Sequence, residues 1–184
     1  MKGIVFSEFL EFVEQRFSIE QAQDMIDACE LESGGAYTSV GTYDHREMIQ
    51  LLGALSSQVD VDVASLQFQF GVHLMGVFAE KFKDFVERAS DLFDFLASIE
   101  DHIHVEVRKL YPDAELPSFT TTELTETRMI MDYRSSRCLS SLAEGLITGA
   151  ADQFKTPIKL TRHTLEMNGE PVVRFTVDRT FHNE

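Results

Sequence analysis

Residues 128–137 read Arg-Met-Ile-Met-Asp-Tyr-Arg-Ser-Ser-Arg and mark the point at which the chain acquires strand patterning. Met129, Met131 and Tyr133 recur at every second position, which is the period of a β-strand with one face on a core. Three further segments have the composition of strands: 119–122, 158–164 and 172–177. Asn168-Gly169 separates the last two and is a strong signal for a two-residue hairpin turn. These features predict an antiparallel sheet of about four strands.

Helical periodicity dominates the chain before this sheet and returns once within it. The segments with apolar residues three and four places apart are 6–17, 19–29, 48–58, 66–70, 74–86, 91–110 and 139–154. Ser18 with Gln21, and Asp44 with Glu47, have the spacing of capping boxes. The sequence therefore predicts an α+β fold in one domain, residues 1–184. Its N-terminal helical part covers about 1–112, and its sheet part, with one helix packed on the sheet, covers about 113–184.

The charge of the chain excludes several classes of partner. Among 184 residues there are 31 acidic and 16 basic ones, giving a net charge of −15. Such a field repels phosphate groups, so we expect neither nucleic-acid nor membrane binding. Residues 1–17 carry several charges and resemble neither a signal peptide nor a membrane span. With only Cys29 and Cys138 as cysteines, the pattern favours a cytoplasmic protein.

An anion clamp is suggested by Tyr133, Ser135 and Arg137. Their spacing of two predicts that they share one strand face with Met129 and Met131. Two hydroxyls and a guanidinium on one face are suited to binding a carboxylate at the edge of an apolar surface. A solvated strand end with a structural salt bridge is the alternative interpretation.

Two histidines, His102 and His104, lie in the long helical segment before the sheet. Neighbours two apart on a helix point away from each other, so they cannot bind one metal ion together. Both fall at the margins of the apolar stripe, and periodicity does not choose between them. A zinc site at Cys138 and His163 looks incomplete because no further cysteine follows.

The remaining polar residues do not indicate catalysis. The spacing of Asp91, Asp94, Glu100 and Asp101 is typical of a solvated helix face. Neither a nucleophile elbow nor a pair of catalytic acids can be located, so we do not expect an enzyme. His73 is the one histidine that we name as a candidate for catalysis, and we expect it in a contact between helices.

Several of these segments resemble the heme nitric oxide/oxygen binding family, H-NOX, which also supplies the heme domain of soluble guanylate cyclase. The matching residues, spread over essentially the whole chain, are Met1-Lys2-Gly3, 33–37, 41–44, His104 with 108–112, Pro117 and 133–137. The last segment is the Tyr-x-Ser-x-Arg motif of the family. By this resemblance heme b lies between the helical part and the sheet, and its iron is bound by His104. Tyr133, Ser135 and Arg137 then bind the heme propionates, and Pro117 presses on the porphyrin.

The resemblance also implies a gas selectivity. Members that bind oxygen place a tyrosine five residues after the motif arginine, where this chain has Leu142. Bound O2 needs a hydrogen-bond donor whereas NO does not, so we expect NO, and CO, to bind ferrous heme while O2 is excluded. Val5 and Phe9 are expected apolar neighbours on the same distal side. Relatives with a zinc site have later cysteines that this chain lacks.

By the same resemblance, NO weakens the bond between iron and His104, relaxes the heme against Pro117 and shifts the helical part against the sheet. Because 184 residues leave no room for an output domain, we expect a sensor that signals to a separate effector. In similar stand-alone members this effector is a histidine kinase or a diguanylate cyclase. A heme-free module that binds an apolar carboxylate in the same pocket is the alternative function.

Overall fold

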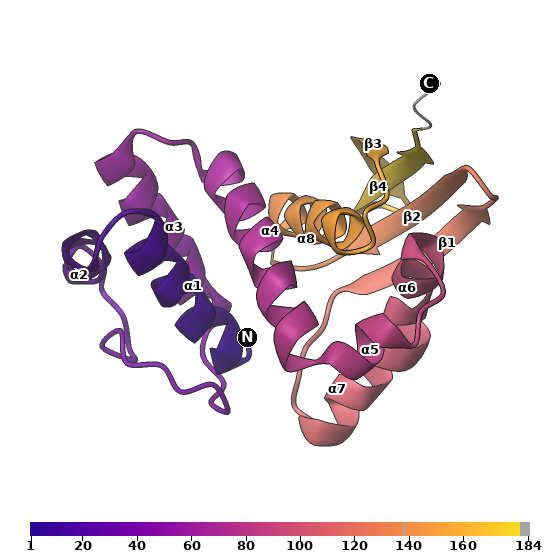
Figure 1. Cartoon of the computed structure of the whole chain (residues 1–184). Helices are drawn as coiled ribbons and strands as arrows, with labels where there is room; N and C mark the ends of the chain where they lie inside the picture. The colour runs from indigo at the N-terminus through magenta and orange to yellow at the C-terminus, as the bar shows by residue number, and fades with distance from the viewer. Residues whose placement is uncertain (138, 181–184) are drawn as a thin grey trace.

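The computed structural model describes residues 1–137 and 139–180 and has an α+β fold. The helices are α1 (Gly3–Arg16), α2 (Ile19–Asp27), α3 (His45–Val59), α4 (Val63–Lys81), α5 (Lys83–Glu87), α6 (Leu92–Ser98), the π-helix η1 (Ile99–Ile103), α7 (His104–Leu110) and α8 (Ser140–Gln153). The strands are β1 (Ser118–Leu124), β2 (Arg128–Arg134), β3 (Ile158–Met167) and β4 (Glu170–Arg179). Helices α1 to α3 lie to one side of α4, and the sheet with α5 to α7 lies to the other (Figure 1). No helix in the described ranges is long and apolar enough to cross a membrane.

Local sequence signals explain where the helices begin. The side chain of Ser18 caps α2 by accepting a hydrogen bond from the backbone N–H of Gln21 at 3.0 Å. The side chain of Asp44 caps α3 by accepting the backbone N–H of Arg46. Both predicted helix starts are confirmed. The prediction of two separate helical segments, 66–70 and 74–86, is wrong, because the single helix α4 runs without a break to Lys81.

The continuity of α4 has a packing explanation. Gly71 and His73, which interrupt the apolar pattern, both face neighbouring helices. Gly71 lies against the backbone of α8, and the His73 ring lies 5.4 Å from that of Phe12 on α1. The expectation that His73 belongs to a contact between helices is confirmed.

The sheet has the order β1-β2-β4-β3, with all neighbours antiparallel. Asn168 and Gly169 have φ angles of 56° and 79°, as a type I′ hairpin turn requires. The strand β2 ends at Arg134, so the prediction that Ser135 and Arg137 continue the face of Tyr133 is wrong. The Ser135 Oγ accepts a hydrogen bond from the Arg137 backbone N–H at 3.2 Å, and this local turn replaces the strand.

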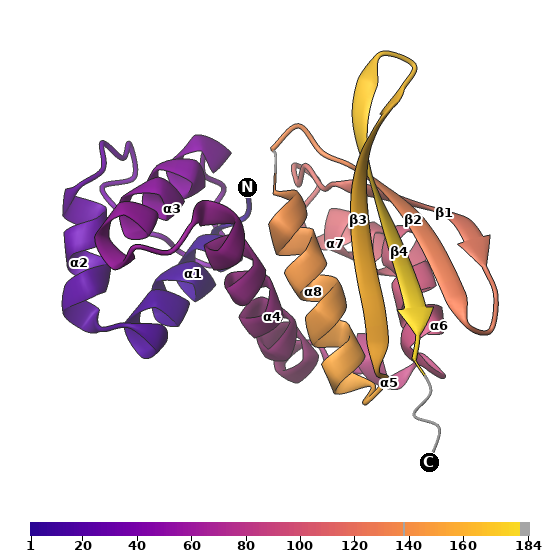
Figure 2. The same cartoon turned by 90° about the horizontal axis from the view of Figure 1, so that it is seen from above.

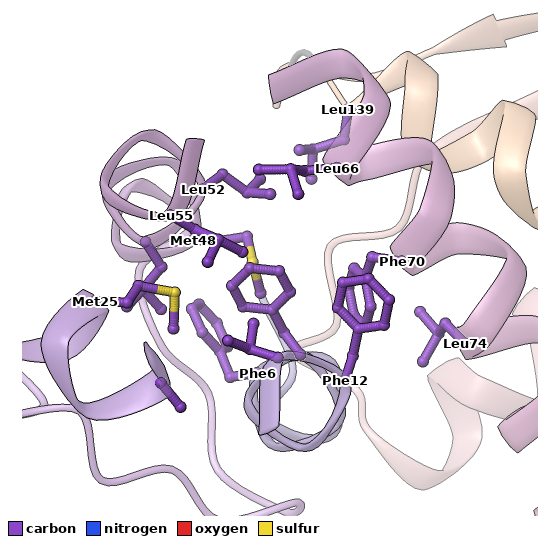
Figure 3. Packing of buried hydrophobic residues seen from close by; sticks show 14 residues of the cluster. Phe6, Phe12, Met25, Met48, Leu52, Leu55, Leu66, Phe70, Leu74 and Leu139 are labelled. Carbon is purple, nitrogen blue, oxygen red and sulfur yellow. The ribbon is translucent and has the colours of Figure 1, made fainter. Parts of the chain in front are cut away.

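Two apolar cores are joined where α4 packs on α8. One core lies among α1 to α4 and includes Phe6, Phe12, Leu52 and Phe70 (Figure 3). The other lies between α6, α8 and the sheet, and α8 is seen between α4 and the sheet in Figure 2. Gly145 of α8 allows the close approach, since a Cβ there would lie 2.1 Å from the carbonyl oxygen of Phe68. The candidate site residues are divided between these two cores.

Candidate functional site

His104 is the first residue of α7 and directly follows the π-helix η1. Its side chain is nearly buried, at 8% exposure, whereas His102 within η1 is exposed. Short π-helical turns inside helices are frequent at functional sites. The structure thus separates two histidines that periodicity left equivalent, and only His104 faces the interior.

Glu100 holds the His104 ring from one turn earlier. Its Oε2 lies 3.1 Å from His104 Nδ1 and accepts the backbone N–H of Phe119, also at 3.1 Å, while its Oε1 accepts from Arg108 Nη2 at 3.3 Å. The interpretation of Glu100 as part of a solvated face is therefore wrong. A carboxylate four residues before a helical histidine was the sequence signal for this pair. Asp91, which the sequence analysis grouped with Glu100, instead caps α6.

Burial favours a neutral imidazole at His104. Burial lowers the pKa of His104, although the hydrogen bond to Glu100 opposes the shift. Burial raises the pKa of Glu100, but the hydrogen bonds from Phe119 and His104 outweigh it, so the net pKa is lowered. An ionised Glu100 accepts the proton of Nδ1, which leaves the lone pair on Nε2. Within the described residues, that Nε2 has no hydrogen-bond partner.

An aromatic wall extends from His104 to the sheet. The ring of Phe119 on β1 lies 6.1 Å from that of His104 and 5.2 Å from that of Tyr133 on β2. Tyr133 is buried and its ring lies 6.1 Å from Phe175 on β4. Pro117 is half-buried and comes two residues before Phe119. The structure therefore brings Tyr133 to the same aromatic region as His104, while Pro117 is placed only by its position just before β1, and Phe119 was missed by the sequence reasoning.

Arg137 is one of the residues that line a polar pocket of about 490 Å³. Its side chain is only 10% exposed, and its Nη2 donates to the Glu115 carboxylate at 2.8 Å. The guanidinium lowers the pKa of Glu115, whose own side chain is 82% exposed. The other residues of the pocket include Met1, Lys2, Thr42, Tyr43, Asp44, His45, Arg46 and Asp113. Arg137 thus already binds a carboxylate that solvent can readily replace.

The predicted distal residues belong to the other core. Phe9 on α1 is fully buried, with its ring 5.0 Å from Phe70. Val5 and Leu142 are half-buried against the same cluster. Leu142 therefore packs with the helical core at the α4–α8 junction, whereas His104 lies beside Phe119, which packs against the sheet core.

The pair that the sequence analysis weighed as an incomplete zinc site, Cys138 and His163, is only partly described by the structure. Cys138 lies outside the described residues, and His163 is exposed on β3. Among residues 1–137 and 139–180, no three histidine, cysteine or acidic side chains are grouped to hold a metal ion.

A nearly buried imidazole whose Nε2 has no partner in the described residues, beside an aromatic wall, fits the binding of heme iron through a histidine. The chain belongs to the haem-NO-binding family, whose model matches residues 2–162. This is a family of heme-binding gas-sensor domains.

Solved structures and a curated relative agree with this assignment. The chain resembles the Fe(II) unliganded H-NOX protein from K. algicida, with a TM-score of 0.93 and 38% identity over 100% of this chain and 99% of that one. It also resembles the H-NOX from Shewanella woodyi in the Fe(II)CO ligation state, with a TM-score of 0.84 and 38% identity over 100% and 97% of the two chains. Soluble guanylate cyclase 89Db of Drosophila melanogaster is 25% identical over 92% of this chain. The chain spans only 25% of that relative's length.

Proposed function

We propose that this chain is a sensor that binds NO, and CO, at ferrous heme b bound by His104, and that it excludes O2. The strongest support is the state of the His104 ring, whose Nδ1 is bonded to Glu100 while Nε2 has no partner in the described residues. The H-NOX from Shewanella woodyi, 38% identical, carries Fe(II)CO. A ferrous heme held by His104 would supply the iron at which a diatomic gas binds.

In our proposal, one group of residues binds the heme propionates and another makes apolar contacts with the cofactor. In our proposal Arg137 exchanges the exposed Glu115 for a propionate, and Tyr133 and Ser135 add their hydroxyl groups. The exchange costs little because Glu115 is 82% exposed. Pro117 and Phe119 supply apolar contacts beside His104, and Phe119 is held there by its backbone hydrogen bond to Glu100 at 3.1 Å.

The distal side explains the proposed selectivity. Leu142, Val5 and Phe9 have no side-chain hydrogen-bond donor, so they do not stabilise the negative charge that O2 acquires when it binds. NO binds ferrous iron tightly without such a donor. We propose that these three residues line the distal face.

We further propose that the chain acts as a single, non-enzymatic cytoplasmic domain, with a helical part of about 1–112 and a sheet part of about 113–184. Its effector is a histidine kinase or a diguanylate cyclase. The net charge of −15 favours a basic docking surface on that protein.

An absorption spectrum of the purified, heme-loaded protein tests the proposal. The protein is reduced without oxygen and then exposed separately to air and to NO. We expect a ferrous spectrum that is unchanged by air and shifted by NO, and we expect His104→Ala to lose the five-coordinate ferrous spectrum. A stable oxygen complex would contradict the selectivity, and failure to hold heme would favour the heme-free carboxylate-binding module.

A further inference from the structure

Glu100 connects three parts of the molecule through one carboxylate. It belongs to η1, it contacts His104 and Arg108 of α7, and it accepts the backbone N–H of Phe119 on β1. Because β1 is an edge strand, an outward N–H has no strand to pair with, and Glu100 supplies the acceptor. The same oxygen, Oε2, accepts from both His104 and Phe119.

No nearby carboxylate duplicates this arrangement. Asp101 is exposed and makes no ion pair among the described residues, and Glu106 is bonded to Lys109 at 2.6 Å. Glu100 is 30% exposed, so its charge is screened less than that of a free surface residue. The His104 imidazole therefore has a single carboxylate partner in this part of the chain.

We propose that Glu100 is a positioning residue that makes His104 a strongly basic ligand and links it to the edge of the sheet. The inference rests on the proposed role of His104 as the iron ligand. A carboxylate that accepts the Nδ1 proton fixes the tautomer and the ring orientation, and raises the electron density on Nε2. A more basic ligand stabilises ferric iron more than ferrous iron, so it lowers the reduction potential of the heme.

The link to β1 gives the pair a second role. Since His104 and Phe119 share one oxygen, a displacement of the imidazole changes the acceptor that holds the Phe119 amide. Phe119 in turn contacts Tyr133 on β2. The carboxylate is therefore a direct mechanical connection between the iron ligand and the sheet.

The first test compares Glu100→Gln with the matched control Glu106→Gln in the heme-loaded protein. Both variants remove one negative charge close to α7, but only the first changes the partner of His104. We expect Glu100→Gln to raise the reduction potential and to lower the iron–histidine stretching frequency of the ferrous protein, relative to Glu106→Gln. Equal potentials and equal frequencies in the two variants would overturn the proposal.

The second test measures hydrogen exchange of the Phe119 amide by NMR in the diamagnetic ferrous CO protein. We expect Glu100→Ala to speed this exchange about tenfold or more relative to Glu106→Ala, since a hydrogen bond to a charged acceptor is lost. The amides of the β2–β4 ladder serve as internal references and should not change. Unchanged protection of Phe119 would overturn the link to β1. If His104→Ala keeps its five-coordinate spectrum, the proposed function itself fails, which is a separate outcome.

Discussion

Leu142 is the residue on which the proposed gas selectivity depends. It is half-buried on α8 and has no hydrogen-bond donor in its side chain. We expect Leu142→Tyr to give the reduced protein a measurable oxygen complex in air, because a phenolic hydroxyl donates to the charge on bound O2. Absorption spectra before and after exposure to air provide the measurement.

A matched variant separates the hydroxyl from the size of the ring. Leu142→Phe adds the same ring without a donor and should remain insensitive to air. Oxygen binding by both variants, or by neither in folded and heme-loaded protein, would contradict the assigned role of Leu142.

At the residue scale the sequence defined candidates but not their contacts. His102 and His104 were equivalent by periodicity because both lie at the edge of the apolar stripe. Their difference in burial arises from the π-helical turn, which has no clear sequence signal. Glu100 was taken for a surface residue because the Phe119 amide reaches it only when η1 packs beside β1, although its spacing from His104 was visible in the sequence.

At the element scale, Asp91 stabilises the start of the helical run that carries His104. Its carboxylate accepts the backbone N–H of Asp94 at 3.0 Å and pairs with Arg179 of β4 at 3.0 Å. The backbone hydrogen bond from Asp94 is the largest cause that lowers the pKa of Asp91, and Arg179 adds to it. A carboxyl group whose pKa is lower in the folded state stabilises the fold above its ordinary pKa of about 3.9. That contribution is lost as the pH falls below this value.

Asp91→Asn keeps a capping oxygen but removes the charge. We therefore expect the variant to unfold more easily than the wild type at pH 7, with a difference that shrinks as the pH falls below about 3.9. Urea unfolding at several pH values measures this difference. Asp101→Asn on the exposed side of η1 is the control, and an Asp91→Asn difference that is independent of pH would show that the charge of Asp91 contributes nothing to stability.

The junction of α4 with α8 yields a prediction about packing. A Cβ on Gly145 would lie 2.1 Å from the carbonyl oxygen of Phe68, so one of the two backbones must move. We expect Gly145→Ala to lower the free energy of unfolding by about 1–3 kcal/mol. Gly76→Ala on α4 is the control, because a Cβ there meets no atom within 4 Å and should stabilise the helix by about 0.5–1 kcal/mol. Chemical denaturation of both variants checks the prediction, and equal stabilities would contradict it.

The elements themselves were largely predictable, and the misses have local causes. The capping residues Ser18 and Asp44 and the Asn168-Gly169 turn act through hydrogen bonds and dihedral angles within a few residues, so the sequence alone specifies them. The end of β2 was misplaced because the Ser135 turn competes with the strand, and this competition is decided only in the folded chain.

At the scale of the whole molecule, the two apolar cores contain different parts of the candidate site. Val5, Phe9 and Leu142 pack with the helical core, whereas Tyr133 and Phe119 pack with the sheet core. The division into a helical part and a sheet part followed from sequence patterning. The α4–α8 contact that joins them could not be predicted, because it depends on glycines in two helices that are distant in sequence.

A cofactor that contacts both cores should stabilise the molecule as one unit. A ligand that binds only the folded state raises stability in proportion to the logarithm of its concentration over its dissociation constant, about 4 kcal/mol at a thousandfold excess. We therefore expect removal of heme to lower the Tm, and His104→Ala to reduce the difference between the loaded and the heme-free protein. Calorimetry on both forms supplies the measurement, with Glu106→Gln as a variant that should retain the full difference. Identical melting of the loaded and heme-free wild type would contradict the prediction, because it would mean that the group does not bind the folded chain in preference to the unfolded one.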